Sequence, residues 1–239
     1  MFKWLKGLRK QPVPTHTIGS RDSGEQALRV DVAEFAPGVL PFLGMTAYLR
    51  LELYEAAARA VSGAPSLRAK DVMSSVAGIA LAKQQRITTE IRRRELDPAE
   101  LMTPYAPVID AYFERIGTPD WHQHVLSLYL VSGLFDGFFA ALAEGLGDPY
   151  RKEVVAVLLE DSGRSEVRDL LASEIVSDPA LTNRLALWGR RLVGDTLLVT
   201  RHVLSLSEGR AFVASEVEPV MTELIADHIR RMDGLGLTA

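Results

Sequence analysis

The stretch VLSLYLVSGLFDGFFAAL, residues 125–142, decides the fold of this chain. It is long and apolar enough for a membrane span, but Ser127, Ser132 and Asp136 interrupt it. A carboxylate in the middle of a lipid-facing helix is energetically costly, and such residues usually face a protein interior. We therefore interpret the stretch as a buried helix at the centre of a soluble protein. A transmembrane helix is the less favoured alternative.

Helices are predicted on both sides of this stretch. Apolar residues such as Leu43, Ala47 and Leu51 recur at the four-residue spacing of a helix face. Proline after a capping residue marks helix starts at Thr118-Pro119 and Asp178-Pro179. Helices are expected at residues 40–61, 67–96, 104–116, 118–145, 150–161, 165–177, 179–207 and 211–232. No segment is typical of a strand. Long helices with short connections predict an antiparallel bundle, so the fold class is all-α.

Composition limits the possible functions. The 239 residues are 47% hydrophobic, enough for one sizeable core, and the net charge of -4 does not favour nonspecific nucleic-acid binding. The chain has no cysteine, which excludes disulfides, zinc–thiolate sites, iron–sulfur clusters and thiol nucleophiles and fits a cytoplasmic protein.

The ends of the chain are predicted to differ from the bundle. Residues 1–11 form a basic amphipathic segment, 12–29 a flexible linker, 30–208 the bundle, and 209–239 a C-terminal helix with a loose tail from residue 234. The first segment combines Phe2 and Trp4 with Lys3 and Lys6, and it is not a secretory signal because no unbroken apolar stretch follows. It either docks on a protein partner or an anionic membrane, or it is a frayed end that packs loosely.

Three stretches carry a family resemblance. They are VAEFAPGVLPFLGMTAY (32–48), the region 102–129 with its TPY and TPDW runs, and RLALWGRRLVGDTLLVTRHVL (184–204). They resemble the MiaE-like proteins of actinobacteria, which are ferritin-like relatives of a tRNA-modifying hydroxylase. The resemblance covers about residues 30–206. It implies a ferritin-like four-helix bundle with additional short helices, descended from a di-iron hydroxylase scaffold, but it does not imply activity.

The ligand pattern of such a di-iron centre is missing from this sequence. The centre needs a Glu from each of two helices and a Glu-x-x-His from each of two others. No histidine here has a glutamate three residues before it. The resemblance aligns the family's ligand positions, now vestigial, with Arg50, Leu81, Gln84, Ser132, Gly137 and Arg164. We therefore expect no metal and no cofactor, with a di-iron centre built from atypical ligands as the alternative.

A charge cluster is predicted where the metal would lie. The hypothesis is that Arg50, with Arg164, pairs with Asp136 or a neighbouring glutamate, because a buried charge needs a partner. The candidate members are Arg50, Glu52, Glu55, Asp136, Arg164 and Glu166. The alternative places Arg50 and Glu52 on the exposed face of their helix.

Aromatic and basic residues offer further candidate sites. The aromatic residues around the central helix line a ligand pocket or, alternatively, fill the core. They are Tyr105, Tyr112, Phe113, Trp121, Tyr129, Phe135, Phe138 and Phe139. Trp188, with Arg190 and Arg191, forms a surface for a partner or, alternatively, an aromatic anchor flanked by snorkelling arginines.

Three functions follow from these observations. The first is a non-catalytic protein that acts by interaction, with a protein partner or as a homo-oligomer, through the N-terminal segment and the helix carrying Trp188 to Arg201. The second is an oxygen-dependent hydroxylase, and the third is a binder of small apolar ligands in the vacated bundle core.

Overall fold

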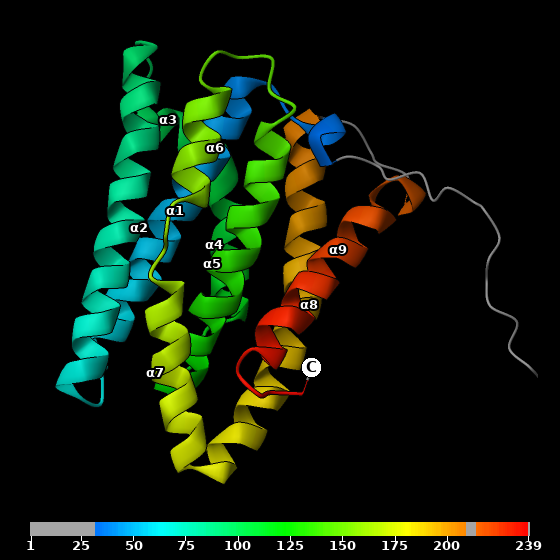
Figure 1. Ribbon diagram of the computed structural model, residues 1–239. Coiled ribbons are helices and arrows are strands. Elements are labelled where there is room, and N and C mark those ends of the chain that lie inside the picture. The colour runs from blue at the N-terminus through cyan, green and yellow to red at the C-terminus, as the bar shows by residue number, and fades with distance from the viewer. Residues whose placement is uncertain (1–31, 209–213, 239) are drawn as a thin grey trace, which may run out of the picture.

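The computed structural model of the protein describes residues 32–208 and 214–238 (Figure 1). Its elements are η1 (Val32–Phe35), α1 (Val39–Ser62), α2 (Leu67–Arg93), α3 (Pro98–Met102), η2 (Thr103–Tyr105), α4 (Ala106–Arg115), α5 (Trp121–Ala143), α6 (Arg151–Leu159), α7 (Arg164–Ser177), α8 (Pro179–Glu208) and α9 (Ala214–Asp233). No strand occurs within the described ranges. The prediction of an all-α fold is confirmed.

Helix α5 is the core of the structure. It is the described helix that is long and apolar enough to cross a membrane, yet 83% of its most apolar window is buried inside the protein. The Asp120 carboxylate caps its start by accepting a hydrogen bond of 3.0 Å from the backbone N–H of Gln123. The burial agrees with the interpretation of residues 125–142 as a central helix.

Helix α5 is one of four sides that enclose a common interior. Helix α1 packs along α2, α2 contacts α6 and α7, both of these contact α5, and α5 contacts α1, which closes the ring. The side opposite α1 consists of α6 and α7, which follow one another along the bundle. Residues 160–163 separate them, and Gly163 there has a φ of 67° in the left-handed region. We call α1, α2, α5 and the α6–α7 pair the four-helix unit.

The remaining helices extend the bundle beyond this unit. Helix α8 contacts α4, α5, α7 and α9, and α9 also contacts α5. In Figure 1, α8 and α9 stand on the side of α5 away from α1 and α2. The additional helices are therefore not all short, since α8 has 30 residues and α9 has 20.

Both ends of the chain bear on the predictions. The loose tail from residue 234 is wrong, because Leu235 and Leu237 are only 5% and 1% exposed. The backbone N–H of Leu237 also donates to the carbonyl of Met232, which folds the tail back on α9. Residues 1–31, with the amphipathic segment of Phe2, Lys3, Trp4 and Lys6 and the whole predicted linker (12–29), lie outside the described residues.

Candidate functional site

A buried ion pair lies at the centre of the four-helix unit. Arg50 of α1 donates from Nη2 to Oδ1 of Asp136 of α5, and the two side chains are only 2% and 1% exposed. The other carboxylate oxygen of Asp136 accepts a hydrogen bond of 2.8 Å from the hydroxyl of Ser162. Because both charges are removed from water, each depends on its partner.

Two further cations share the same carboxylate. The Lys83 ammonium of α2 lies 4.0 Å from Oδ2 of Asp136, and the Arg164 guanidinium of α7 lies 3.7 Å from it. Lys83 is 3% exposed, whereas Arg164 is 34% exposed. Each side of the four-helix unit thus supplies one member of this central cluster of Arg50, Lys83, Asp136 and Arg164.

Lys83 also fixes the break between α6 and α7. Its ammonium donates to the backbone carbonyls of Leu158 and Glu160 at 3.3 Å and 2.7 Å, and to the hydroxyl of Ser162 at 2.7 Å. These carbonyls belong to the C-terminal end of α6, where a cation is favourable. Burial is the largest influence on the ammonium and lowers the pKa of Lys83 to about 8, with Arg50 and Arg164 adding to the effect and Asp136 opposing it.

The central cluster does not fit a di-iron centre. Such a centre uses four carboxylates and two imidazoles from four facing helices. Here the four facing helices supply one carboxylate and three cations. Across residues 32–208 and 214–238, no group of three or more histidine, aspartate or glutamate side chains is arranged to hold a metal ion. Two iron ions at this place would face like charges in place of ligands.

The structure brings only part of the predicted charge cluster together. Arg50, Asp136 and Arg164 meet, but the three glutamates do not reach them. Glu55 lies on the surface and pairs with Arg59 at 3.6 Å. Glu52 is half-buried elsewhere on α1, where burial is the largest cause of its raised pKa, and Glu166 is exposed. Glu52 and Glu55 lie two and five positions from Arg50 on α1, so their side chains point in other directions than that of Arg50. This is why the predicted contact of these two glutamates with Arg50 is wrong.

The structure also corrects the ligand positions that the family resemblance implied on α2 and α5. Leu81 and Gln84 are half-buried, and the side chain that enters the centre is Lys83 between them. Ser132 does border the centre, whereas a side chain at Gly137 would point towards Asp227 of α9. The predicted site residues do not include Lys83. Its position four residues before the buried Ile87 nevertheless places it on the apolar face of α2.

The centre of the four-helix unit contains a small cavity. Its volume is about 30 Å³, and its polar lining residues are Arg50, Lys83, Tyr129, Ser132, Ser162 and Arg164. A cavity needs roughly 10–15 Å³ to hold one water molecule, so this cavity has room for one or two waters or a small ion. A ligand in the bundle core, as expected for a small-ligand binder, has no room here.

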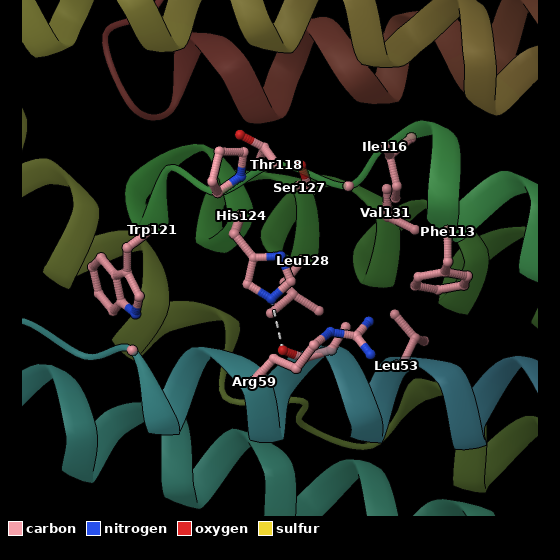
Figure 2. A pocket seen from close by; sticks show the side chains of 14 residues that line it. Leu53, Arg59, Phe113, Ile116, Thr118, Trp121, His124, Ser127, Leu128 and Val131 are labelled. Carbon is pink, nitrogen blue, oxygen red and sulfur yellow. Dashed lines mark hydrogen bonds between the residues drawn. The ribbon is translucent and has the colours of Figure 1, made fainter.

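A larger cavity lies between α1, α4 and the start of α5. Its volume is about 250 Å³, and Figure 2 shows side chains from all three elements pointing into it. Its apolar walls are formed by Leu53, Phe113, Ile116, Leu128 and Val131. The wall of this large cavity is mostly apolar, as is typical of ligand pockets.

The polar atoms of the large cavity are mostly already paired. Trp121 donates from its indole nitrogen to the carbonyl of Ala60 at 2.8 Å, and Nε2 of His124 lies 2.7 Å from the carbonyl of Ala56 (Figure 2). Because a carbonyl only accepts, Nε2 of His124 carries the proton. Burial lowers the pKa of His124, so the ring is neutral and its Nδ1 is a hydrogen-bond acceptor.

Arg59 is the cation of the large cavity. Its side chain is 55% exposed, and its ion pair with Glu55 is a surface pair at 3.6 Å, which contributes little. No aspartate or glutamate lines this cavity. An anionic group entering it would meet Arg59 without repulsion from a lining carboxylate.

Most of the aromatic residues serve as core. The rings of Phe42, Phe138 and Phe139 meet edge to face at centroid distances of 5.3–6.0 Å, and Tyr112 meets Phe135 in the same way at 5.8 Å. Of the predicted aromatic set, Phe113 and Trp121 line the large cavity and Tyr129 lines the small one.

Trp188 is an anchor between helices. Its indole nitrogen donates to the hydroxyl of Ser127 on α5 at 2.8 Å, and the ring is half-buried. The Arg191 guanidinium lies 5.1 Å from the ring centroid, within range of a cation–π contact. The structure thus matches the anchor alternative.

The outer side of α8 is partly apolar and partly basic. Leu187 and Leu198 are 66% and 59% exposed, and Arg190, Arg191 and Arg201 are exposed beside them. We call these five residues the α8 surface. An open hollow of about 660 Å³ adjoins it, bordered by Arg115 of α4, Met221 of α9 and Asp195.

The ring of four sides around one interior defines a four-helix bundle of ferritin-like architecture. A family described as "Ferritin-like domain, actinomycetes" matches residues 33–217. This match spans most of the chain, and the protein belongs to that family. No curated protein matches the sequence.

Proposed function

We propose that this ferritin-like protein works without a di-iron centre and acts by binding rather than by catalysis. The observation that carries the proposal is the central cluster, in which Arg50, Lys83 and Arg164 surround Asp136 where a di-iron member would place its ligands. A MiaE-like origin accounts for such a site, since the scaffold keeps its four facing positions and changes their chemistry. The lack of cysteine supports a cytoplasmic location.

Metal content tests this proposal directly. The protein is purified from iron-supplemented cells and analysed for metals, alongside a di-iron ferritin-like protein prepared in the same way. We expect iron far below one ion per chain, unchanged by anaerobic addition of Fe²⁺. A stoichiometry near two irons per chain, as in the di-iron bundles, would restore the hydroxylase hypothesis and overturn the proposal.

The large cavity is where a small ligand would bind. Its volume of about 250 Å³ lies just below the range of roughly 300–1,000 Å³ for drug-sized ligands, which favours a smaller molecule. The apolar wall around Phe113 and Leu128 suits an aromatic or branched body. Arg59 at this wall suits a single carboxylate, because a guanidinium forms paired hydrogen bonds with a carboxylate.

Ligand binding is tested with a matched series of probes. Phenylacetate, phenylacetamide and phenethylamine share one apolar body and differ in charge, and titration calorimetry compares them. We expect phenylacetate to bind most tightly and Arg59→Gln to weaken it about tenfold, which corresponds to about 1.4 kcal/mol, without affecting the amide. Arg93→Gln is the control, since Arg93 is 63% exposed on α2. Equal affinities for the three probes, or no loss in Arg59→Gln, would contradict the assignment.

The α8 surface favours a second candidate, binding of an acidic protein segment. Exposed leucines flanked by arginines match an amphipathic partner helix with carboxylates along its edges. Gly194, between Arg191 and Leu198, has no atom within 4 Å of where a Cβ would stand, so the helix face is open there.

The α8 surface is tested with a synthetic acidic amphipathic helix. Its affinity is compared with that of a peptide in which lysines replace the glutamates, for the protein and for Arg191→Gln/Arg201→Gln. We expect preference for the acidic peptide and loss of that preference in the double variant, with Arg93→Gln unaffected. Sedimentation of the protein alone shows whether a second copy occupies the surface, which would replace the acidic partner in this assignment.

A further inference from the structure

The small cavity at the centre of the four-helix unit has an unusual charge environment. It is bordered by Arg50, Lys83 and Arg164, and no aspartate or glutamate lines it. Asp136 lies near all three cations but is not among the residues that line the cavity. The open space therefore faces the side of the central cluster that is not neutralised.

The central cluster carries more positive than negative charge. Two buried cations, Arg50 and Lys83, and the 34% exposed Arg164 face the single carboxylate of Asp136, so the charges of the cluster do not cancel. Asp227 of α9 does not relieve this excess, because it already pairs with Arg230 and, at 3.4 Å, with Arg231. Buried charge without compensation is strongly unfavourable, so the excess calls for an anion.

An unpaired donor also belongs to this cavity. The Nε–H of Arg50 is buried and has no hydrogen-bond partner among the described residues. The side chain of Arg50 is 2% exposed and lines the cavity, so bulk water does not satisfy this group. A buried donor left without an acceptor is costly, which points to an acceptor held inside the cavity.

We propose that the small cavity binds one small monovalent anion of about the size of chloride. The volume of about 30 Å³ admits a single such ion and excludes an organic carboxylate. A water molecule would satisfy Nε of Arg50 but would leave the charge excess unchanged. The anion does both, and Ser132 places a hydroxyl at the wall as a further donor. The cation-lined cavity is thus opposite in charge to a di-iron centre, which carboxylates hold.

Chloride-dependent stability is the first measurement. Unfolding is followed in urea at constant ionic strength, with sodium gluconate replacing sodium chloride, because gluconate is too large for the cavity. A ligand that binds only the folded protein raises the unfolding midpoint with concentration. We expect the midpoint to rise with chloride, and no chloride-specific rise would overturn the proposal.

Three variants locate the effect. Arg50→Met removes the unpaired donor and is expected to abolish the chloride dependence. Arg164→Gln changes a cation that is 34% exposed, so it keeps the fold readily and is expected to weaken the dependence. Arg93→Gln on the surface of α2 is expected to retain it in full. A chloride dependence that persists in both Arg50→Met and Arg164→Gln would place the ion elsewhere and contradict the assignment.

Crystals grown in sodium bromide give the direct test. Bromide scatters anomalously, and we expect a single strong peak in the small cavity within hydrogen-bonding distance of Nε of Arg50. A peak that is absent there, with density for water alone, would overturn the proposal whatever the result of the metal analysis.

Discussion

Arg50 and Asp136 stand 86 positions apart in the chain and form an ion pair in which both side chains are almost fully buried. The pair joins the first and the central helix of the four-helix unit. Lys83 and Arg164 approach the same carboxylate, so Asp136 serves three cations at once. The energetic importance of the two partners is therefore unequal.

Replacing Asp136 is expected to cost more stability than replacing Arg50. Asp136→Asn leaves three cations without a carboxylate and is expected to lower the free energy of unfolding by about 3–5 kcal/mol. Arg50→Met leaves Asp136 with two cations and is expected to cost at least about 1 kcal/mol less than Asp136→Asn. Urea unfolding monitored by circular dichroism measures both values.

The surface variant Arg93→Met provides the control and is expected to stay within about 0.5 kcal/mol of the wild type. If Arg50→Met proved as damaging as Asp136→Asn, the carboxylate would not be the shared partner that the geometry indicates.

The lowered pKa of Lys83 predicts that the protein becomes more stable as the pH rises above about 8. In the folded protein its pKa is about 8, whereas in the unfolded chain it returns to about 10.5. Between these values the unfolded chain binds more protons, so the free energy of unfolding increases with pH. The gap corresponds to on the order of 3 kcal/mol when complete.

The measurement is the difference in pH dependence between the wild type and Lys83→Met. This difference is needed because burial raises the pKa of Tyr48, Tyr112 and Tyr150, which lowers stability in the wild type above about pH 10. Lys70→Met, at an exposed position of α2, should leave the profile unchanged. Superimposable profiles for the wild type and Lys83→Met would show that Lys83 stays fully charged in the fold.

Gly163 is expected to be required at the break between α6 and α7. Its φ of 67° is strained for other residues, and a Cβ there would stand 2.9 Å from a methyl group of Val76. Gly163→Ala is expected to cost about 1–3 kcal/mol, because left-handed backbone strain and a steric clash add. The strain would also shift Ser162 away from Asp136.

Gly147 supplies the matched control, since no atom lies within 4 Å of where its Cβ would stand and its φ is not positive. Gly147→Ala is expected to change stability by less than about 0.5 kcal/mol. Equal costs in thermal unfolding for the two variants would remove the special role of Gly163.

Much of the fold follows from local patterns in the sequence. The apolar run at 125–142 identifies α5, and capping residues followed by proline place the starts of α5 and α8 within a few residues. The family resemblance directed attention to Arg50, and the need of a buried charge for a partner made Asp136 one of its candidate partners; the structure shows that pair.

The sequence was less informative wherever side-chain direction decided the outcome. A shift of one residue on a helix turns the side chain by about 100°, which separates Lys83 from the predicted Gln84. The large cavity depends on how α1, α4 and α5 approach one another, and no local pattern reports that distance. The prediction for the tail after residue 234 failed for a similar reason, since Leu235 and Leu237 join a core built from residues distant in the sequence.

His228 is expected to make the protein sensitive to mild acid. Its side chain is 3% exposed, and burial is the main cause of its lowered pKa, with Arg231 adding to the effect and a backbone hydrogen bond with Gly189 opposing it. Below about pH 6.5 the unfolded chain takes up a proton that the folded protein resists, so stability falls as the pH falls. His124 acts in the same direction for the same reason.

The decisive comparison is the loss of stability between about pH 7 and about pH 5 in the wild type, in His228→Leu and in His202→Gln. His202 is exposed on α8, so His202→Gln shows whether removing an exposed imidazole has the same effect as removing the buried one. We expect the loss to shrink in His228→Leu, because the group that resists protonation is gone, and to persist in His202→Gln. A loss of equal size in all three proteins would mean that carboxylates, rather than the buried imidazole, govern unfolding in acid.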